Sequence, residues 1–162
     1  MSYPPERYSA DGGEVSAVHH PHDAPRELDN TSGGGAAYLA TGALTHGLFG
    51  LYRWDMGPGP GGPDPHFHRT ITESFYVLNG AIRLYDGQRW ITGVAGDFLY
   101  VPEGGIHAFK NESGEPASML ILFSPGAPRE DYFETLADPT RREGMTDEER
   151  VEFYLRHDNH WL

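Results

Sequence analysis

Short apolar runs, each ended by Gly, Pro, Asn or Asp, fill the middle of the chain between residues 36 and 124. Runs rich in Tyr, Phe, Leu, Ile and Val at this length are typical of β-strands separated by turns. We expect strands at Ala36–Thr41, Leu48–Asp55, Glu73–Leu78, Ala81–Tyr85, Gln88–Val94, Phe98–Val101, His107–Asn111 and Ala117–Phe123. Many strands at short, even spacing predict an all-β sandwich or barrel in one piece.

Two dipeptides within this region are turn signals. Asn79-Gly80 and Asp86-Gly87 flank the expected strand Ala81–Tyr85. Asn-Gly and Asp-Gly readily adopt the positive φ angles of tight hairpin turns. The sequence therefore predicts a hairpin on each side of that strand.

The two ends of the chain lack the strand pattern. Residues 1–35 are polar and interrupted by Pro and Gly, which predicts a flexible N-terminal arm that could cover a sheet edge on a partner subunit. After Pro125, apolar residues in Arg129–Ala137 recur at helical spacing, and Thr146 with Glu149 forms a capping box that opens a second helix. We divide the chain into an arm (1–35), a barrel (36–124) and a tail of two short helices (125–162).

The second helix has an apolar side, which we expect to pack on the outside of the barrel or on a neighbouring subunit. Its members are Val151, Phe153, Tyr154 and Leu155. The last residues, His157, His160 and Trp161, are interpreted as packing and surface residues.

Composition supports the all-β prediction and excludes some partners. The 162 residues include 21 Gly and 13 Pro, which favours turns over long helices. With 24 acidic against 12 basic residues the net charge is −12, so nucleic acids and anionic membranes would be repelled. There is no cysteine, which leaves His, Asp and Glu as metal ligands. No signal or membrane-spanning pattern is seen, and we expect a cytoplasmic protein.

Three histidines and one glutamate form the candidate chemistry. Alternate residues of a β-strand face the same way, so His66 and His68 can bind one ion. Glu73 has the opposite parity, and the segment 69–72 must bend or bulge to bring it back. His107 must approach from a neighbouring strand, which a barrel allows. His19, His20 and His22 form another cluster, but it lies in the predicted flexible arm and we assign it no role.

The full spacing resembles the two sequence motifs of the cupin superfamily. The first motif reads His66, Phe67, His68, four residues, Glu73, six residues, Gly80; the second reads Gly96, five residues, Pro102, one residue, Gly104, two residues, His107, three residues, Asn111. One position departs from the family pattern, because Pro60 stands where a glycine is expected before His66 and the nearest glycine is Gly61. That glycine serves a turn and not the metal.

The resemblance implies a jelly-roll β-barrel, often dimeric, so we expect a homodimer. It also implies a metal site with the ligands His66, His68, Glu73 and His107. Gly80, Gly96, Pro102 and Gly104 would be structural, and Asn111 is interpreted as a turn residue.

Four protein ligands leave an octahedral ion two open positions, so a small-molecule substrate could bind one divalent ion per chain. Fe, Mn, Ni or Co, which we favour, could couple an oxygen-donor substrate to O₂, whereas Zn could act only as a Lewis acid. Glu73 could also detach from the ion and take a proton as a catalytic base.

The overall plan looks like small bacterial quercetin-dioxygenase-like cupins. This resemblance favours a dioxygenase that acts on an aromatic or enolic substrate. A non-redox cupin, such as a polyketide cyclase, lyase or isomerase, is the alternative. A metal-containing small-molecule binding protein is the third reading, because fold alone does not imply function.

Several apolar residues could line the substrate pocket. Phe75 and Val77 share the face of Glu73, and Phe109 shares that of His107. Tyr52 and Trp54 could line the mouth. Ordinary barrel core explains the same residues equally well.

Overall fold

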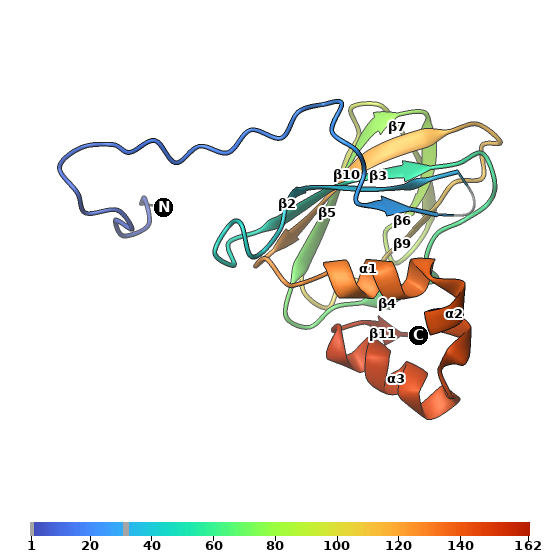
Figure 1. The fold of residues 1–162 in the computed structure, drawn as a ribbon. Coiled ribbons are helices and arrows are strands. Elements are labelled where there is room, and N and C mark those ends of the chain that lie inside the picture. The colour runs from blue at the N-terminus through green and yellow to red at the C-terminus, as the bar shows by residue number, and fades with distance from the viewer. Residues whose placement is uncertain (1, 31–32) are drawn as a thin grey trace.

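Two antiparallel sheets form the body of the molecule (Figure 1). The computed structural model describes residues 2–30 and 33–162. The six-stranded sheet has the order β1 (Leu28–Asp29), β2 (Gly35–Ala40), β3 (Gly50–Met56), β10 (Ala117–Ser124), β5 (Thr72–Asn79) and β8 (Phe98–Val101). The three-stranded sheet has the order β7 (Trp90–Val94), β6 (Ala81–Tyr85) and β9 (Ala108–Lys110). The predicted all-β jelly-roll fold is confirmed, although the sheets are not hydrogen-bonded into one closed barrel.

The core lies between the two sheets. Phe75 and Val77 of β5, Ile82 of β6 and Met119 of β10 are each 0% exposed. The ring of Phe75 meets that of Phe109 from β9 with centroids 5.5 Å apart. Contacts between the sheets explain why these strands carry apolar residues at alternate positions.

The two turn signals have different roles in the structure. Asp86-Gly87 begins the predicted hairpin, in which Tyr85 of β6 pairs with Trp90 of β7. Asn79-Gly80 does not form a hairpin, because β5 and β6 belong to different sheets. Gly80 still needs its positive φ of 74°, and a Cβ there would lie 2.7 Å from the Pro116 carbonyl oxygen. The dipeptide marks a sharp crossing between sheets and not a strand pair.

Three helices and a short strand follow the sheets: α1 (Glu130–Ala137), α2 (Pro139–Gly144), α3 (Asp147–Arg156) and β11 (His160–Trp161). The predicted capping box opens α3, where Thr146 Oγ1 accepts from the Glu149 N–H and Glu149 Oε2 accepts from the Thr146 N–H. The prediction of only two helices was wrong. It missed α2, whose N-terminus is capped by the Asp138 side chain with proline at the first helical position.

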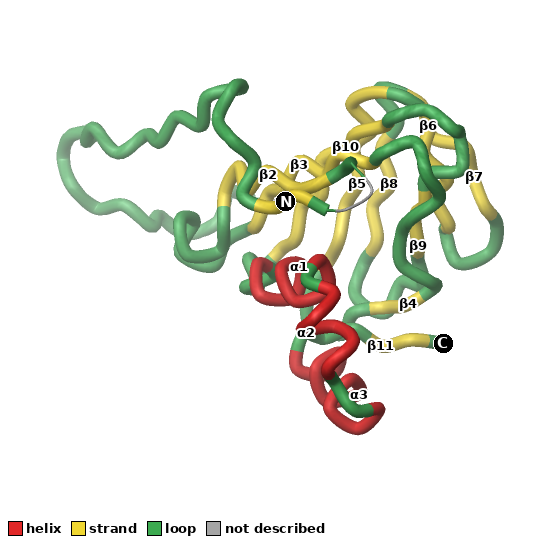
Figure 2. The backbone as a smooth tube through the Cα atoms, turned by 45° about the vertical axis from the view of Figure 1, so that its right-hand side comes forward, coloured by secondary structure: helices red, strands yellow, loops and turns green. Residues whose placement is uncertain are grey.

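The helical tail packs beneath the sandwich (Figure 2). The ring of Phe153 in α3 is buried and stacks on that of Tyr132 in α1, with centroids 5.6 Å apart. Val151 and Leu155, which were expected on the packed side, are 57% and 54% exposed. Strand β11 pairs with β4 (His66–Phe67), so the end of the tail joins the strand that carries the first predicted ligand.

The N-terminal segment extends away from the sandwich in Figure 1. Leu28 and Asp29 of the predicted arm form β1, which pairs with β2 at the edge of the larger sheet. Within the described residues, no helix is both long enough and apolar enough to cross a bilayer.

Candidate metal centre

His66 and His107 are held opposite each other by backbone hydrogen bonds. The N–H of His66 donates to the carbonyl of His107 at 3.0 Å, and the reverse bond measures 2.9 Å. This antiparallel bridge places the two imidazole centroids 4.4 Å apart. The expected approach of His107 from a neighbouring segment is thereby observed.

Glu73 reaches the same point because the chain bends between β4 and β5. Strand β4 ends at Phe67 and β5 begins at Thr72, so residues 68–71 break the alternation that would have sent Glu73 to the far face. Glu73 Oε2 lies 3.0 Å from His68 Nε2 and 2.8 Å from His107 Nε2. The bend required by strand parity is present.

All three imidazoles are oriented by backbone carbonyls. The Nδ1 atoms of His66, His68 and His107 donate to the carbonyls of Asp64, Asp158 and Gly105 at 2.8, 2.6 and 2.9 Å. A carbonyl oxygen only accepts, so each Nδ1 carries a proton, which leaves Nε2 as the atom available to a cation. The rings therefore present Nε2 toward one another.

The four side chains are buried and their candidate ligand atoms lie within 4.8 Å of one another. They form the one group of His, Cys, Asp or Glu among the described residues that could hold a metal ion. Three imidazole nitrogens and one carboxylate oxygen suit Fe, Mn, Ni, Co and Zn alike. The cluster could hold one ion, and its composition does not identify the element.

Electrostatics give Glu73 and His66, but not His107, the protonation state that a metal ligand needs. Burial opposes charge on the Glu73 carboxylate, but His107 and His68 outweigh burial and lower the pKa of Glu73. Burial, helped by the charge of His107, lowers the pKa of His66 to about 4. Burial disfavours the charged form of His107, yet Glu73 raises its pKa. Glu73 is therefore ionised and His66 neutral at physiological pH, as metal ligation requires.

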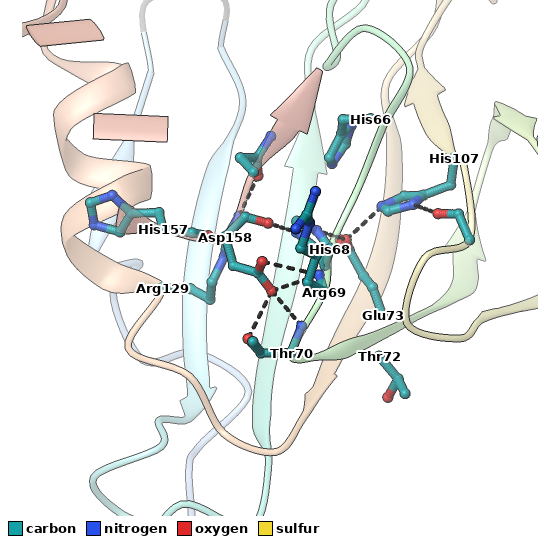
Figure 3. A network of polar contacts seen from close by, with 12 residues as sticks. His66, His68, Arg69, Thr70, Thr72, Glu73, His107, Arg129, His157 and Asp158 are labelled. Atoms are coloured by element: carbon teal, nitrogen blue, oxygen red, sulfur yellow. Dashed lines mark hydrogen bonds and ion pairs between the residues drawn. The ribbon is translucent and has the colours of Figure 1, made fainter. Parts of the chain in front are cut away.

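Asp158 ties the bend to the end of the chain (Figure 3). Its carboxylate accepts hydrogen bonds from the Arg69 N–H, the Thr70 N–H and the Thr70 hydroxyl at 2.9, 2.7 and 2.8 Å. Its carbonyl holds His68. Burial opposes ionisation of Asp158, but the bonds from Thr70 and Arg69 outweigh it and lower its pKa. One residue thus holds both a ligand and the bend that returns Glu73.

A cavity of about 470 Å³ opens beside the cluster, between the sandwich and the helical tail. His66 and Glu73 contribute to its wall, as do Trp54 and Phe109 from the sheets. The other pocket residues expected from the sequence, Tyr52, Phe75 and Val77, are each 0% exposed and lie in the core. Tyr52 donates its hydroxyl proton to Glu130 Oε1 at 2.6 Å.

The tail supplies cavity residues that sequence reasoning missed. Tyr132 and Phe133 of α1, Arg129 before it and Trp161 of β11 all line the cavity. The Trp161 ring lies 5.0 Å from that of His66, so the tail contacts the metal cluster as well as the cavity.

Comparisons with known proteins agree with this architecture. Residues 52–123 match the family described as Cupin domain. Over 74 residues the chain is 35% identical to quercetin 2,3-dioxygenase of Bacillus subtilis (strain 168), covering 46% of this chain and 21% of that protein. The chain spans from 21% to 50% of the length of the curated relatives it matches.

Solved structures show the same fold at low identity. A predicted oxalate decarboxylase from Thermotoga maritima is 21% identical with a TM-score of 0.58, covering 67% of this chain and 99% of that one. An RmlC-like cupin from Shewanella frigidimarina is 18% identical with a TM-score of 0.55, covering 72% and 96%. At these identities the likeness concerns the fold alone.

Proposed function

We propose that this chain, which contains a cupin domain, is a mononuclear metal-dependent enzyme that acts as a dioxygenase on a small aromatic or enolic oxygen-donor substrate. One observation carries the proposal: His66 and Glu73 belong both to the buried cluster and to the wall of the 470 Å³ cavity. An ion held by the cluster would therefore face a space that fits a small organic molecule. The 35% identity to quercetin 2,3-dioxygenase over 74 residues supports the choice of reaction.

One divalent ion per chain would be held by His66, His68, Glu73 and His107. Fe, Mn, Ni or Co would supply the redox chemistry that O₂ requires. The protein's part is to orient the ligands through carbonyl hydrogen bonds and to keep water away with the aromatic cavity wall. Trp54 and Phe109 form part of that wall on the sheet side.

We propose that Glu73 acts as a ligand and not as a base. Two imidazoles contact its Oε2, and they lower its pKa below the ordinary value. A carboxylate with a lowered pKa has a weak drive to accept a substrate proton near pH 7.

A non-redox enzyme is the second candidate, because the same ligand set suits Zn. In that case the chain would be a polyketide cyclase, lyase or isomerase that polarises its substrate. A binding protein is the third, in which the metal and the cavity hold a small molecule unchanged.

We also propose that the chain forms a homodimer. Tyr76 and Leu78 of β5 and Phe98 and Tyr100 of β8 are exposed at 43, 39, 62 and 55%. Tyr76 and Phe98 are direct partners in the sheet, so the four side chains share its outer face. An exposed apolar group of this kind supports contact with a second copy.

Metal analysis and oxygen uptake test the proposed function. The purified protein should carry about one divalent ion per chain. His66→Ala should lose most of that ion, whereas His22→Ala, at an exposed histidine of the arm, should keep it. An oxygen electrode with flavonols and related enediols should then record uptake by the Fe, Mn, Ni or Co form. Only trace metal after reconstitution would end the metal proposal, and absent uptake with every redox-capable ion would favour the alternatives.

A further inference from the structure

Arg129 is a buried cation whose protein hydrogen-bond acceptors are neutral. Its side chain is 3% exposed and precedes α1. Nη1 donates to the His157 carbonyl at 2.6 Å and Nη2 to Asn159 Oδ1 at 3.2 Å. Nε has no hydrogen-bond partner among the described residues. A buried charge that meets only neutral acceptors is costly, so its retention calls for an explanation.

Aromatic rings hold the guanidinium in place. Its Cζ lies 4.1 Å from the ring centre of Tyr132, 5.1 Å from that of Phe123 and 5.6 Å from that of Phe133. These contacts stabilise a cation within an apolar wall. The carboxylates of Glu73 and Asp158 act on this charge from a distance, but neither accepts a hydrogen bond from Arg129.

The same cavity wall contains Arg129, His66 and Glu73. Phe123 shows how near the cation is to the cluster. It is the direct strand partner of Glu73, and its ring lies 6.4 Å from that of His68. Arg129 packs on this ring, so a small molecule in the cavity could reach both the cluster and the guanidinium.

Charge balance indicates the kind of molecule that fits. A divalent ion with Glu73 and three neutral imidazoles carries a net charge of +1, and Arg129 raises the total to +2. The other charged lining residues have partners: Asp55 pairs with Arg26 and Arg53, and Arg142 pairs with Glu143. A cavity with apolar walls and this excess positive charge favours an anion.

We propose that Arg129 determines substrate specificity by binding the carboxylate of an anionic substrate whose aromatic or enolic oxygen faces the metal. The planar guanidinium matches a carboxylate in shape and charge. This inference names the substrate class of the proposed metal enzyme and rests on that function. It predicts that a neutral amide of the same shape binds poorly.

Calorimetry with matched ligand pairs tests the inference. Zn-loaded protein is titrated with salicylate against salicylamide and with benzoate against benzamide. The carboxylates should bind about 10- to 100-fold more tightly, the range expected for hydrogen bonds to a charged partner. Arg129→Gln should reduce this preference to near unity, and Arg129→Lys should keep part of it. Arg142→Gln changes an arginine of the same cavity and should leave the preference unchanged.

The wild-type comparison can overturn the inference even if Arg129→Gln does not fold, and Arg129→Lys then tests the role of the guanidinium. Equal binding of acid and amide by wild-type protein, or no binding of any of the four ligands, would overturn the inference. So would a folded Arg129→Gln variant that still prefers carboxylates. His66→Ala tests anion binding separately from metal binding. If this variant still prefers carboxylates, and the preference is lost when Arg129 is also replaced, the anion site is supported even if the proposed metal function is wrong.

Discussion

Replacing Asp158 by glycine should weaken metal binding about 10- to 100-fold, although Asp158 supplies no ligand atom. Its carboxylate holds the bend that returns Glu73 to the site, through the Arg69 and Thr70 N–H groups and the Thr70 hydroxyl. Glycine removes the carboxylate and keeps the carbonyl that orients His68. Glycine also accepts the positive φ of 55° at this position without strain.

The magnitude follows from these three hydrogen bonds. At about 1 kcal/mol net for each, their loss removes about 3 kcal/mol that holds the bend. The metal needs Glu73 and His68 together, so in the variant its binding would have to order the bend again. Part of the lost ~3 kcal/mol would therefore be subtracted from the free energy of metal binding. A loss of about 1.4 to 2.7 kcal/mol in binding corresponds to the stated 10- to 100-fold.

Competition with a chromogenic chelator measures the effect on metal-free protein loaded with Co or Zn. Asp23→Gly makes the same change at an exposed turn of the N-terminal arm and should bind metal like wild type. Circular dichroism establishes that both variants are folded. A folded Asp158→Gly protein with wild-type affinity would refute the idea that the tail supports the site.

Three further predictions concern stability and assembly. In metal-free protein, His66 should make the free energy of unfolding fall as the pH drops from about 6.5 to about 4. In this range the His66 side chain binds a proton in the unfolded chain but stays neutral in the folded protein, where its pKa is about 4. Urea unfolding at several pH values should show that the free energy of unfolding depends less steeply on pH in His66→Gln than in wild type. Equal pH dependence in the two proteins would contradict the lowered pKa of His66. Thr146→Ala removes the capping box and should cost about 1 kcal/mol of stability without changing metal content, as thermal melts and metal analysis can check. Light scattering should find a wild-type dimer that Phe98→Asp converts to a monomer; a monomeric wild type would reject the dimer.

Local backbone geometry explains why the grouping of His66, His68 and Glu73 could be predicted. His66 and His68 are two residues apart on a strand, so their shared face follows from the period of the strand. The parity of Glu73 then required a bend, and the structure has one at residues 68–71. These inferences needed only the relation between neighbouring residues.

The support of the site could not be predicted in this way. Asp158 contacts His68 across 90 positions of sequence, and no local pattern reports such a contact. Arg129 looked like the start of an amphipathic helix, and Trp161 like a surface residue. The hairpin predicted at Asn79-Gly80 was wrong for a different reason: a glycine with positive φ can lie at a crossing between sheets as well as in a hairpin turn. Local sequence signals predict the backbone conformation of a segment but not which strands pair with each other.

The pairing of β11 with β4 has a consequence for the order in which the protein is made. All four proposed ligands have been synthesised once His107 is added, but Asp158 follows 51 residues later. At about 5 to 20 residues per second, the ribosome needs about 3 to 10 s to reach it. During that interval the nascent chain has its complete ligand set without the contact that orients His68. We therefore expect tight metal loading to await the emergence of the tail, so ribosome-bound chains arrested before Asp158 should exchange the ion readily.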